Sequence, residues 1–341
     1  MSKPDDLVSS LYDAMLLDLD GTVYHGARSI PGVAETVRKL RERGNRVRFV
    51  TNNASKAPGE VAGNLRGMAI DAEAAEVSTS AQAGARLLAE RLSAGTPVLV
   101  VGAPALVAEV EAAGLRAVRE AGDGVAAVVQ GHWTETGWRH LAEASVAIRA
   151  GALWVACNVD ATLPTERGQL PGNGSMVMAL RTATGAEPEV AGKPAAPLLR
   201  TAAASAGAAR ALVVGDRLDT DIAGAVAAGL DSLAVLTGVA TPAGLLAAGP
   251  AERPRYLAAD LTALIEPASA LAVGPREGWR VTVDGGRLVA ASTGSTDALD
   301  LLRALCGLAW ESGHTEVGAA DDRAALALAE LGLASGAAAI G

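Results

Sequence analysis

MLLDLDGT, residues 15–22, is the stretch around which the rest of the chain is interpreted. Its apolar residues Met15–Leu17 predict a short buried strand, and the acidic residues Asp18 and Asp20 follow at its end. Side chains two positions apart on a strand share a face, so the two carboxylates are expected to lie close together. Such a pair is typical of a metal site, or of one ionised and one protonated carboxyl group, but it is equally compatible with an ordinary Asp-Gly turn.

A second strand predicted nearby also ends in polar residues. Val47–Val50 is apolar and is followed by Thr51, Asn52 and Asn53. Between the two strands, Pro31–Arg43 has the apolar spacing of a helix that stops at a glycine. Strand, helix and strand in this order form the unit that builds a parallel sheet through a right-handed crossover.

Two further segments bring the same kind of chemistry. Lys193 follows a glycine in the segment Gly192–Pro194, and the apolar strand Ala211–Val214 is followed by Asp216 and Asp221. Ligands of an open parallel sheet bind outside the carboxyl ends of its strands, where all these groups are expected to gather. Carboxylates, one lysine and hydroxyl or amide donors describe a site for a phosphate group and Mg²⁺, with Asp18, Asp216 and one backbone carbonyl as the protein ligands.

Length and composition limit the class of protein. The 341 residues predict two or three domains, and half of them are hydrophobic, which is ample for sizeable cores. The net charge of −9 argues against a nucleic-acid partner, since phosphate-backbone binding requires a basic face. The N-terminus lacks the apolar region of a secretory signal, and no apolar stretch reaches membrane-spanning length. The two widely separated cysteines are expected to be reduced, packed thiols. Together, these features predict a cytoplasmic protein without a membrane partner.

The middle and the end of the chain differ in character. Further strand and helix patterns up to about Glu187 predict a second α/β unit, which contains a long polar loop at Cys157–Ser175. From about Pro267 the pattern changes to a hairpin around Asp284–Gly286 and two helices, Asp297–Trp310 and Asp322–Leu331. The first of these helices has Ser295 or Thr296 as its expected cap. This last region predicts a small α+β domain.

Four motifs in this order resemble the haloacid dehalogenase superfamily: DLDGT at 18–22, VTNN at 50–53, GKP at 192–194 and GDRLDTD at 215–221. The match is to its phosphatases with a large α/β cap, the NagD-type group that includes pyridoxal-phosphate, glycerol-phosphate and phosphoglycolate phosphatases. The resemblance implies a Rossmann-like doubly wound parallel sheet core with an inserted α/β cap domain, and the small α+β C-terminal domain predicted above lies outside the family pattern. The expected boundaries are 8–81 with 188–266 for the core, 82–187 for the cap and 267–341 for the C-terminal region.

The same resemblance implies a role for each matched residue. Asp18 is the expected nucleophile that becomes a phosphoaspartate, and Asp20 is the general acid and base whose backbone carbonyl also binds Mg²⁺. Thr51 and the Asn52 N–H hold the phosphoryl group, Lys193 offsets its charge, and Asp216 completes the metal site. Asp221 is expected to orient the water molecules on the metal or Lys193, without binding the metal itself. Substrate binding is assigned to Thr51, Asn52, Asn53, Asn158, Asp160 and Lys193.

The predicted reaction is Mg²⁺-dependent hydrolysis of a small phosphorylated metabolite. The cap loop lacks an aromatic residue for stacking on a ring, which favours glycerol 3-phosphate or phosphoglycolate as substrate. Pyridoxal phosphate and nucleotide monophosphates remain alternatives. A regulatory or binding role through the C-terminal region is the alternative from another class. Members of the group commonly dimerise through the cap, so a homodimer is one expected assembly.

Overall fold

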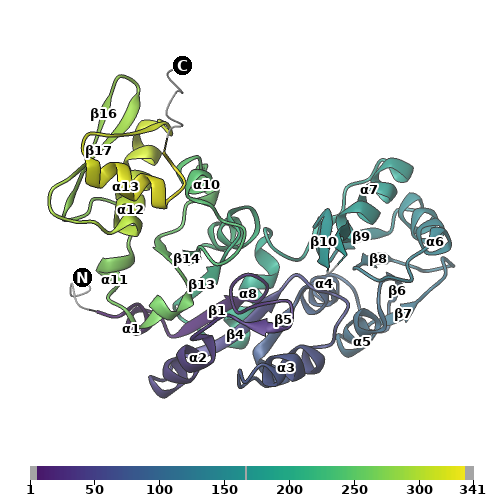
Figure 1. The fold of residues 1–341 in the computed structure, drawn as a ribbon. Coiled ribbons are helices and arrows are strands. Elements are labelled where there is room, and N and C mark those ends of the chain that lie inside the picture. Colours follow the sequence, from purple (N-terminus) through teal and green to yellow (C-terminus); the bar gives the residue numbers. More distant parts are fainter. Residues whose placement is uncertain (1–5, 166, 335–341) are drawn as a thin grey trace. The chain divides into compact units, whose positions relative to one another are not determined.

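The computed structural model describes residues 6–165 and 167–334, which are shown in Figure 1. The chain forms two compact units. The first consists of Met1–Val47 and Ala208–Gly341, and the second of Arg48–Gly207. No helix among the described residues combines the length and the apolar character that crossing a bilayer requires.

The first unit contains four adjacent parallel strands in the order β15-β14-β13-β1. These are β1 (Ala14–Asp18), β13 (Ala211–Gly215), β14 (Asp231–Val235) and β15 (Tyr256–Ala258). Leu16 of β1 is in register with Val213 of β13, and both are fully buried apolar residues, as is typical of parallel sheets covered on both faces. The helices of this part are α1 (Val8–Leu11), α2 (Val33–Glu42), α9 (Ala223–Ala228), α10 (Pro242–Leu246) and α11 (Ala268–Leu271).

The second unit contains a five-stranded parallel sheet in the order β12-β9-β8-β6-β7. Its strands are β6 (Pro97–Val101), β7 (Arg116–Val118), β8 (Ala127–Gln130), β9 (Leu153–Ala156) and β12 (Glu189–Val190). Helices α6 (Trp138–Arg149) and α7 (Asn173–Thr184) bury their apolar residues against Val128 and Trp154 on one face. Gly84 of α4 (Ser80–Ala89) lies against Val129, which points to the other face.

The two chain ends of the second unit meet. β4 (Arg46–Thr51) enters the unit and pairs in parallel with β5 (Val77–Thr79). The guanidinium of Arg48 donates to Ser205, with Nη2 2.7 Å from the backbone oxygen and Nε 3.1 Å from Oγ. Ser205 is the last residue of α8 (Ala196–Ser205), so this contact joins the first and the last segments of the unit. Helices α3 (Pro58–Gly67) and α5 (Pro104–Ala112) complete it.

The C-terminal domain, from β16 to α13, has a mixed sheet. β16 (Trp279–Asp284) and β17 (Arg287–Ser292) are antiparallel, and β18 (Val317–Ala319) runs parallel to β17. Helices α12 (Ala298–Ser312) and α13 (Asp322–Glu330) pack on it. The predicted fold class, an α/β core with a small α+β C-terminal domain, is confirmed; the three domain boundaries stay a prediction.

Two local expectations were wrong. Residues 157–175 are not one long loop, because β10 (Thr162–Thr165) and β11 (Gly168–Pro171) pair as an antiparallel hairpin. The cap of α12 is Asp297, whose side chain accepts from the Asp300 N–H, rather than Ser295 or Thr296. The turn before α9 is π-helical over Leu218–Ile222, and the regular helix begins at Ala223.

Candidate functional site

Three carboxylates gather at the carboxyl edge of the strands in the first unit. Each of Asp18, Asp216 and Asp221 offers one oxygen atom, and these atoms all lie within 4.8 Å of one another. Asp18 is the last residue of β1, Asp216 follows β13 directly, and Asp221 lies in the π-helical turn after it. We call these three residues the carboxylate cluster.

Two loops fix the position of Asp216. The Val239 N–H donates to Asp216 Oδ2 at 2.7 Å, and the Ala240 N–H donates to the Asp216 backbone oxygen at 2.7 Å. The Thr22 hydroxyl donates to Asp216 Oδ1 at 3.3 Å. The loop after β14 is tied down further, because the Thr237 hydroxyl donates to the Gly21 carbonyl at 2.5 Å. The carboxylate is therefore oriented by fixed donors from both loops.

Two glycines leave the space that this carboxylate fills. A Cβ on Gly21 would lie 2.5 Å from Asp216 Oδ2, and Gly21 has a positive φ of 89°. A Cβ on Gly238 would overlap the same carboxylate. Both residues must be glycine for Asp216 to keep its place.

Asp20 is arranged differently from the cluster. It is exposed, beyond the end of β1, and forms an isolated bridge with Tyr24. Burial raises the pKa of Tyr24 to about 12, with further contributions from the negative charges of Asp20 and then Asp18. Asp219 is also exposed and forms an ion pair with Arg217, 2.7 Å from Nη2 to Oδ2, as expected for a solvated carboxylate.

The carboxylate cluster fits a hard divalent cation. Its donors are all carboxylate oxygens, the ligands that Mg²⁺ and Ca²⁺ prefer. Asp216 and Asp221 are each only 1% exposed, and like charges held this close in a buried site repel unless a cation offsets them. Asp18, Asp216 and Asp221 are thus the side chains that would hold the metal, whereas the family resemblance implied only a role outside the metal ligands for Asp221.

In the second unit, Asn52 and Lys193 form a two-point contact. Asn52 Oδ1 accepts from the Lys193 N–H at 2.8 Å, and Asn52 Nδ2 donates to the Lys193 carbonyl at 2.9 Å. Lys193 is only 2% exposed, and it follows β12 of the five-stranded sheet. Asn52 Nδ2 also lies 3.3 Å from Asp160 Oδ2, so the structure brings these three predicted site residues together.

Further amides extend this contact, and we call Asn52, Asn158 and Asn173 the amide network. Asn158 Nδ2 donates to the Asn52 carbonyl at 2.7 Å, and Asn173 Nδ2 donates to the Asn158 carbonyl at 2.7 Å. The Ser80 hydroxyl donates to the Asn52 carbonyl as well, at 2.5 Å. The side chain of Asn158 is therefore buried and engaged with the protein.

Thr51 and Asn53 lie beside the amide network at the end of β4. Thr51 Oγ1 accepts from the Asn53 N–H at 3.1 Å. Asn53 Oδ1 accepts from the Ser55 N–H at 2.8 Å and the Lys56 N–H at 3.2 Å, which forms a turn. Its side-chain oxygen therefore holds the loop.

Some residues that shape these groups received no role from the sequence: Thr22, Ser80, Asn173, Thr237, Gly238 and Val239. The position of Thr237, two residues after the end of β14, was a usable signal, because the predicted site residues lie near strand ends too. Val239 contributes only its backbone N–H, which any residue type other than proline supplies.

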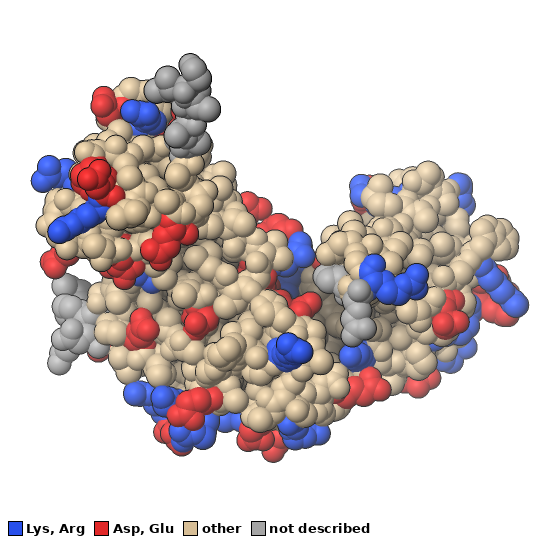
Figure 2. All heavy atoms as spheres, viewed as in Figure 1, with Lys and Arg blue, Asp and Glu red and all other residues tan. Residues whose placement is uncertain are grey.

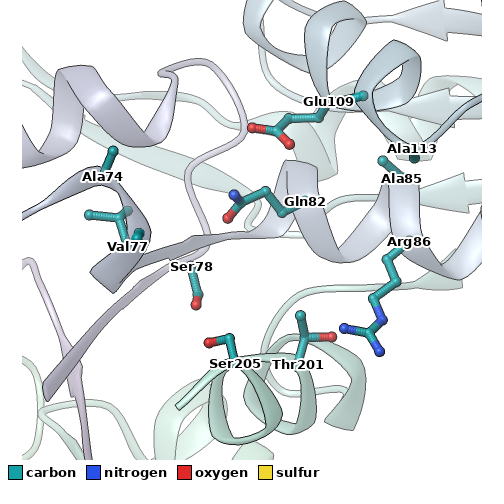
Figure 3. Close-up of a pocket in the computed structure, with 12 residues that line it drawn as sticks. Ala74, Val77, Ser78, Gln82, Ala85, Arg86, Glu109, Ala113, Thr201 and Ser205 are labelled. Carbon is teal, nitrogen blue, oxygen red and sulfur yellow. The ribbon is translucent and has the colours of Figure 1, made fainter. Parts of the chain in front are cut away.

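A separate cavity of about 300 Å³ lies between α4, α5 and α8 in the second unit (Figure 3). Its lining includes Arg86, Glu109, Gln82 and Thr201, and its twelve lining residues include none of the predicted site residues. Burial raises the pKa of the Glu109 carboxyl group. On the face shown in Figure 2, acidic and basic side chains are interspersed over the surface.

The strand-end carboxylates, the Gly192–Pro194 segment and the fold agree with the comparisons, and the chain belongs to the haloacid dehalogenase-like hydrolase family. Residues 15–116 match the family model of that description, and residues 190–264 match a second, HAD-hydrolase-like model. Residues 276–333 match a model described as a GCN5-related N-acetyltransferase like domain.

Known phosphatases are similar to this chain over two thirds of its length or more. A D-glycerol 3-phosphate phosphatase of Mycobacterium tuberculosis is 48% identical over 335 residues, 94% of each chain. A structure of the glycerol phosphate phosphatase of that organism in complex with magnesium superposes with a TM-score of 0.93 and 49% identity, over 96% of this chain and 99% of that one. An acid sugar phosphatase of Staphylococcus aureus is 38% identical over 67% of this chain and 88% of its own.

Proposed function

We propose that this protein is a Mg²⁺-dependent phosphomonoesterase whose preferred substrate is glycerol 3-phosphate. The observation that carries the proposal is the carboxylate cluster, with three oxygens within 4.8 Å of one another, in a chain 48% identical to a D-glycerol 3-phosphate phosphatase. A similar enzyme has been crystallised with magnesium and with calcium, which supports the same choice of metal here.

In the proposed mechanism, a carboxylate oxygen of Asp18 attacks phosphorus while the bond between phosphorus and the leaving oxygen breaks. The product of this step is a phosphoaspartate. Asp20 gives a proton to the departing alkoxide and then takes one from the water that hydrolyses the phosphoaspartate. The exposed position of Asp20 beyond the strand end is compatible with proton exchange. Asp18, Asp216 and Asp221 would hold Mg²⁺, with the Asp20 backbone carbonyl as a further ligand. Bound Mg²⁺ supplies neutralisation of the charge on the phosphoryl oxygens.

The groups of the second unit are proposed to bind the phosphoryl group. Thr51 and the Asn52 N–H donate hydrogen bonds to its oxygens, and Lys193 offsets its charge. The two-point contact with Asn52 supports this role, because it holds the Lys193 backbone in one position. Asp160 is proposed to bind the substrate hydroxyl groups, and Asn158 to position Asn52. Asn53 is proposed to contact the substrate directly, in addition to holding the turn through its side-chain oxygen.

The test is a phosphate-release assay with Mg²⁺ and with EDTA. The panel contains glycerol 3-phosphate, phosphoglycolate, pyridoxal phosphate, nucleotide monophosphates and p-nitrophenyl phosphate. We expect the highest kcat/KM for glycerol 3-phosphate and no release in EDTA. A higher kcat/KM for pyridoxal phosphate or a nucleotide would overturn the substrate, and Mg²⁺-independent release would overturn the mechanism.

Three further assignments are proposed on the sequence. The cytoplasmic location rests on two buried free thiols, Cys157 and Cys306. A homodimer is proposed from the family resemblance and would be tested by light scattering of the purified protein. The C-terminal domain is proposed to serve the phosphatase rather than a separate binding function.

A further inference from the structure

The C-terminal domain and the phosphatase sheet share one hydrophobic core. Ala234 of β14, Leu257 of β15 and Leu245 of α10 belong to the same buried cluster as Leu301 and Leu305 of α12. Polar contacts cross the same boundary, because Arg303 Nε donates to the Leu257 carbonyl at 2.9 Å. The C-terminal domain is therefore part of the packing of the first unit.

The C-terminal domain also contacts α10, the short helix that follows the loop of residues 237–240 beside Asp216. Residues 237–240 run directly into α10, whose cap Thr241 accepts from the Gly244 N–H. A helix of five residues is too short to be stable alone and depends on what packs against it. Trp310 of α12 supplies that support: its indole N–H donates to the Leu245 carbonyl at 2.8 Å.

One continuous chain segment, residues 239–245, connects the Trp310 contact with Asp216 of the carboxylate cluster. Leu245 lies four residues after Thr241, and the two preceding residues donate to Asp216: Val239 to Oδ2 and Ala240 to the backbone oxygen. The π-helical turn that carries Asp221 touches the same core through Ile222 and Leu218. Both loops that hold metal-binding carboxylates thus rest on the core completed by the C-terminal domain.

We propose that Trp310 is a positioning residue for the metal site and that, through α10, it sets the affinity of the phosphatase for Mg²⁺. This inference rests on the proposed function, since it assigns Mg²⁺ to the carboxylate cluster. Loss of the indole N–H removes this hydrogen bond to the Leu245 carbonyl, which loosens α10 and the donors that orient Asp216.

The test compares two tryptophan-to-phenylalanine variants. Trp310→Phe removes the hydrogen bond to α10, whereas Trp279→Phe removes one that stays inside the C-terminal domain, from Nε1 to the Asp297 carbonyl at 2.9 Å. Mg²⁺ binding to the substrate-free full chain is measured by calorimetry, together with kcat, KM and the melting temperature. For Trp310→Phe we expect the Kd for Mg²⁺ to rise about three- to tenfold, with KM at saturating Mg²⁺ unchanged.

Trp279→Phe is expected to lower the melting temperature and leave the Kd for Mg²⁺ as in the wild type. Equal Kd values in all three proteins, or equal increases in both variants, would overturn the proposal. If Trp310→Phe does not fold, Arg253→Gln takes its place, because the Arg253 guanidinium lies 5.6 Å from the Trp310 ring centroid and a smaller rise in Kd is expected. A wild-type protein that binds no Mg²⁺ would instead refute the proposed function itself.

Discussion

Asn52 and Lys193, which are 141 residues apart in the sequence, are joined by two hydrogen bonds that use both polar atoms of the asparagine side chain. Oδ1 accepts from the Lys193 N–H, and Nδ2 donates to the Lys193 carbonyl. An asparagine is suited to this contact because it carries a donor and an acceptor side by side.

Asn52→Ala removes both bonds and should lower kcat by about 10²-fold, because Lys193 loses its fixed position. Kinetics with glycerol 3-phosphate at saturating Mg²⁺ measure this effect. Asn53→Ala is the comparison: it opens the turn held by Asn53 Oδ1, so the melting temperature should fall, and the proposed substrate contact should appear as a raised KM with a smaller loss of kcat than in Asn52→Ala. A larger loss of kcat in Asn53→Ala than in Asn52→Ala would contradict this role of Asn52.

Asp18→Asn should reduce kcat by about 10⁴-fold or more, since an amide cannot act as the nucleophile. The fold should survive, because Asp18 stands at the end of its strand and is not part of the apolar core. Asp219→Asn, at the exposed partner of Arg217, should keep nearly full activity. Substantial turnover by Asp18→Asn would exclude it as the nucleophile.

Gly238→Ala should weaken Mg²⁺ binding, because the added Cβ overlaps the Asp216 carboxylate and must displace it. A calorimetric titration should show a Kd for Mg²⁺ raised by about tenfold or more, as expected when a ligand loses its orientation. Gly59→Ala in α3 adds a Cβ that meets nothing within 4 Å and should leave the Kd unchanged. Wild-type affinity in Gly238→Ala would show that Asp216 does not depend on this loop.

Glu109 provides a prediction on pH. Burial raises the pKa of its carboxyl group in the folded protein, so the folded state binds a proton more tightly than the unfolded state. Stability is then lost as the pH rises from the unfolded pKa through the folded one. Glu109→Gln should therefore melt at a higher temperature than the wild type at pH 7.5, and the difference should vanish at pH 4. Glu111→Gln, at an exposed position of the same helix, is the matched variant and should melt close to the wild type at pH 7.5.

The two cysteines should be unreactive in the native protein. Burial raises the pKa of each thiol, Cys157 and Cys306, to about 12, which leaves almost no thiolate at pH 8. Titration with a disulfide reagent should label neither thiol in buffer and both in guanidinium chloride. Rapid labelling of the native protein would show that one of these sites opens readily.

The carboxylate cluster was predictable because residue type and strand position coincide there. Asp18, Asp216 and Asp221 follow apolar strands, and parallel strands direct their carboxyl ends to one edge. The donors that orient Asp216 were not predictable in the same way, since a backbone N–H such as that of Val239 leaves no mark on the residue type. The inward orientation of Asn158 also depends on neighbours distant in sequence.

The fold class was predictable from the alternation of strands and helices, whereas short elements were not. β7 and β18 have three residues each, too few for a periodic pattern. Packing of the C-terminal region beside the core was one of the expected arrangements, but the residues that form the shared core were not predictable, because Leu245 and Leu257 have the same character as any buried leucine. Nothing in an apolar sequence tells which distant helix will cover it.

The contact between Arg48 and Ser205 bears on the order in which the chain folds. During synthesis, residues 48–207 are complete before β13 is made, so β1 has to wait for β13, one of its two neighbouring strands, until the whole second unit has been synthesised. A disordered segment of that length would make the pairing entropically costly. In a folded second unit, the hydrogen bonds between Arg48 and Ser205 hold its first and last segments together. The length of flexible chain between β1 and β13 is then much shorter. We therefore expect early folding of the inserted segment to lower the entropic cost of pairing β1 with β13.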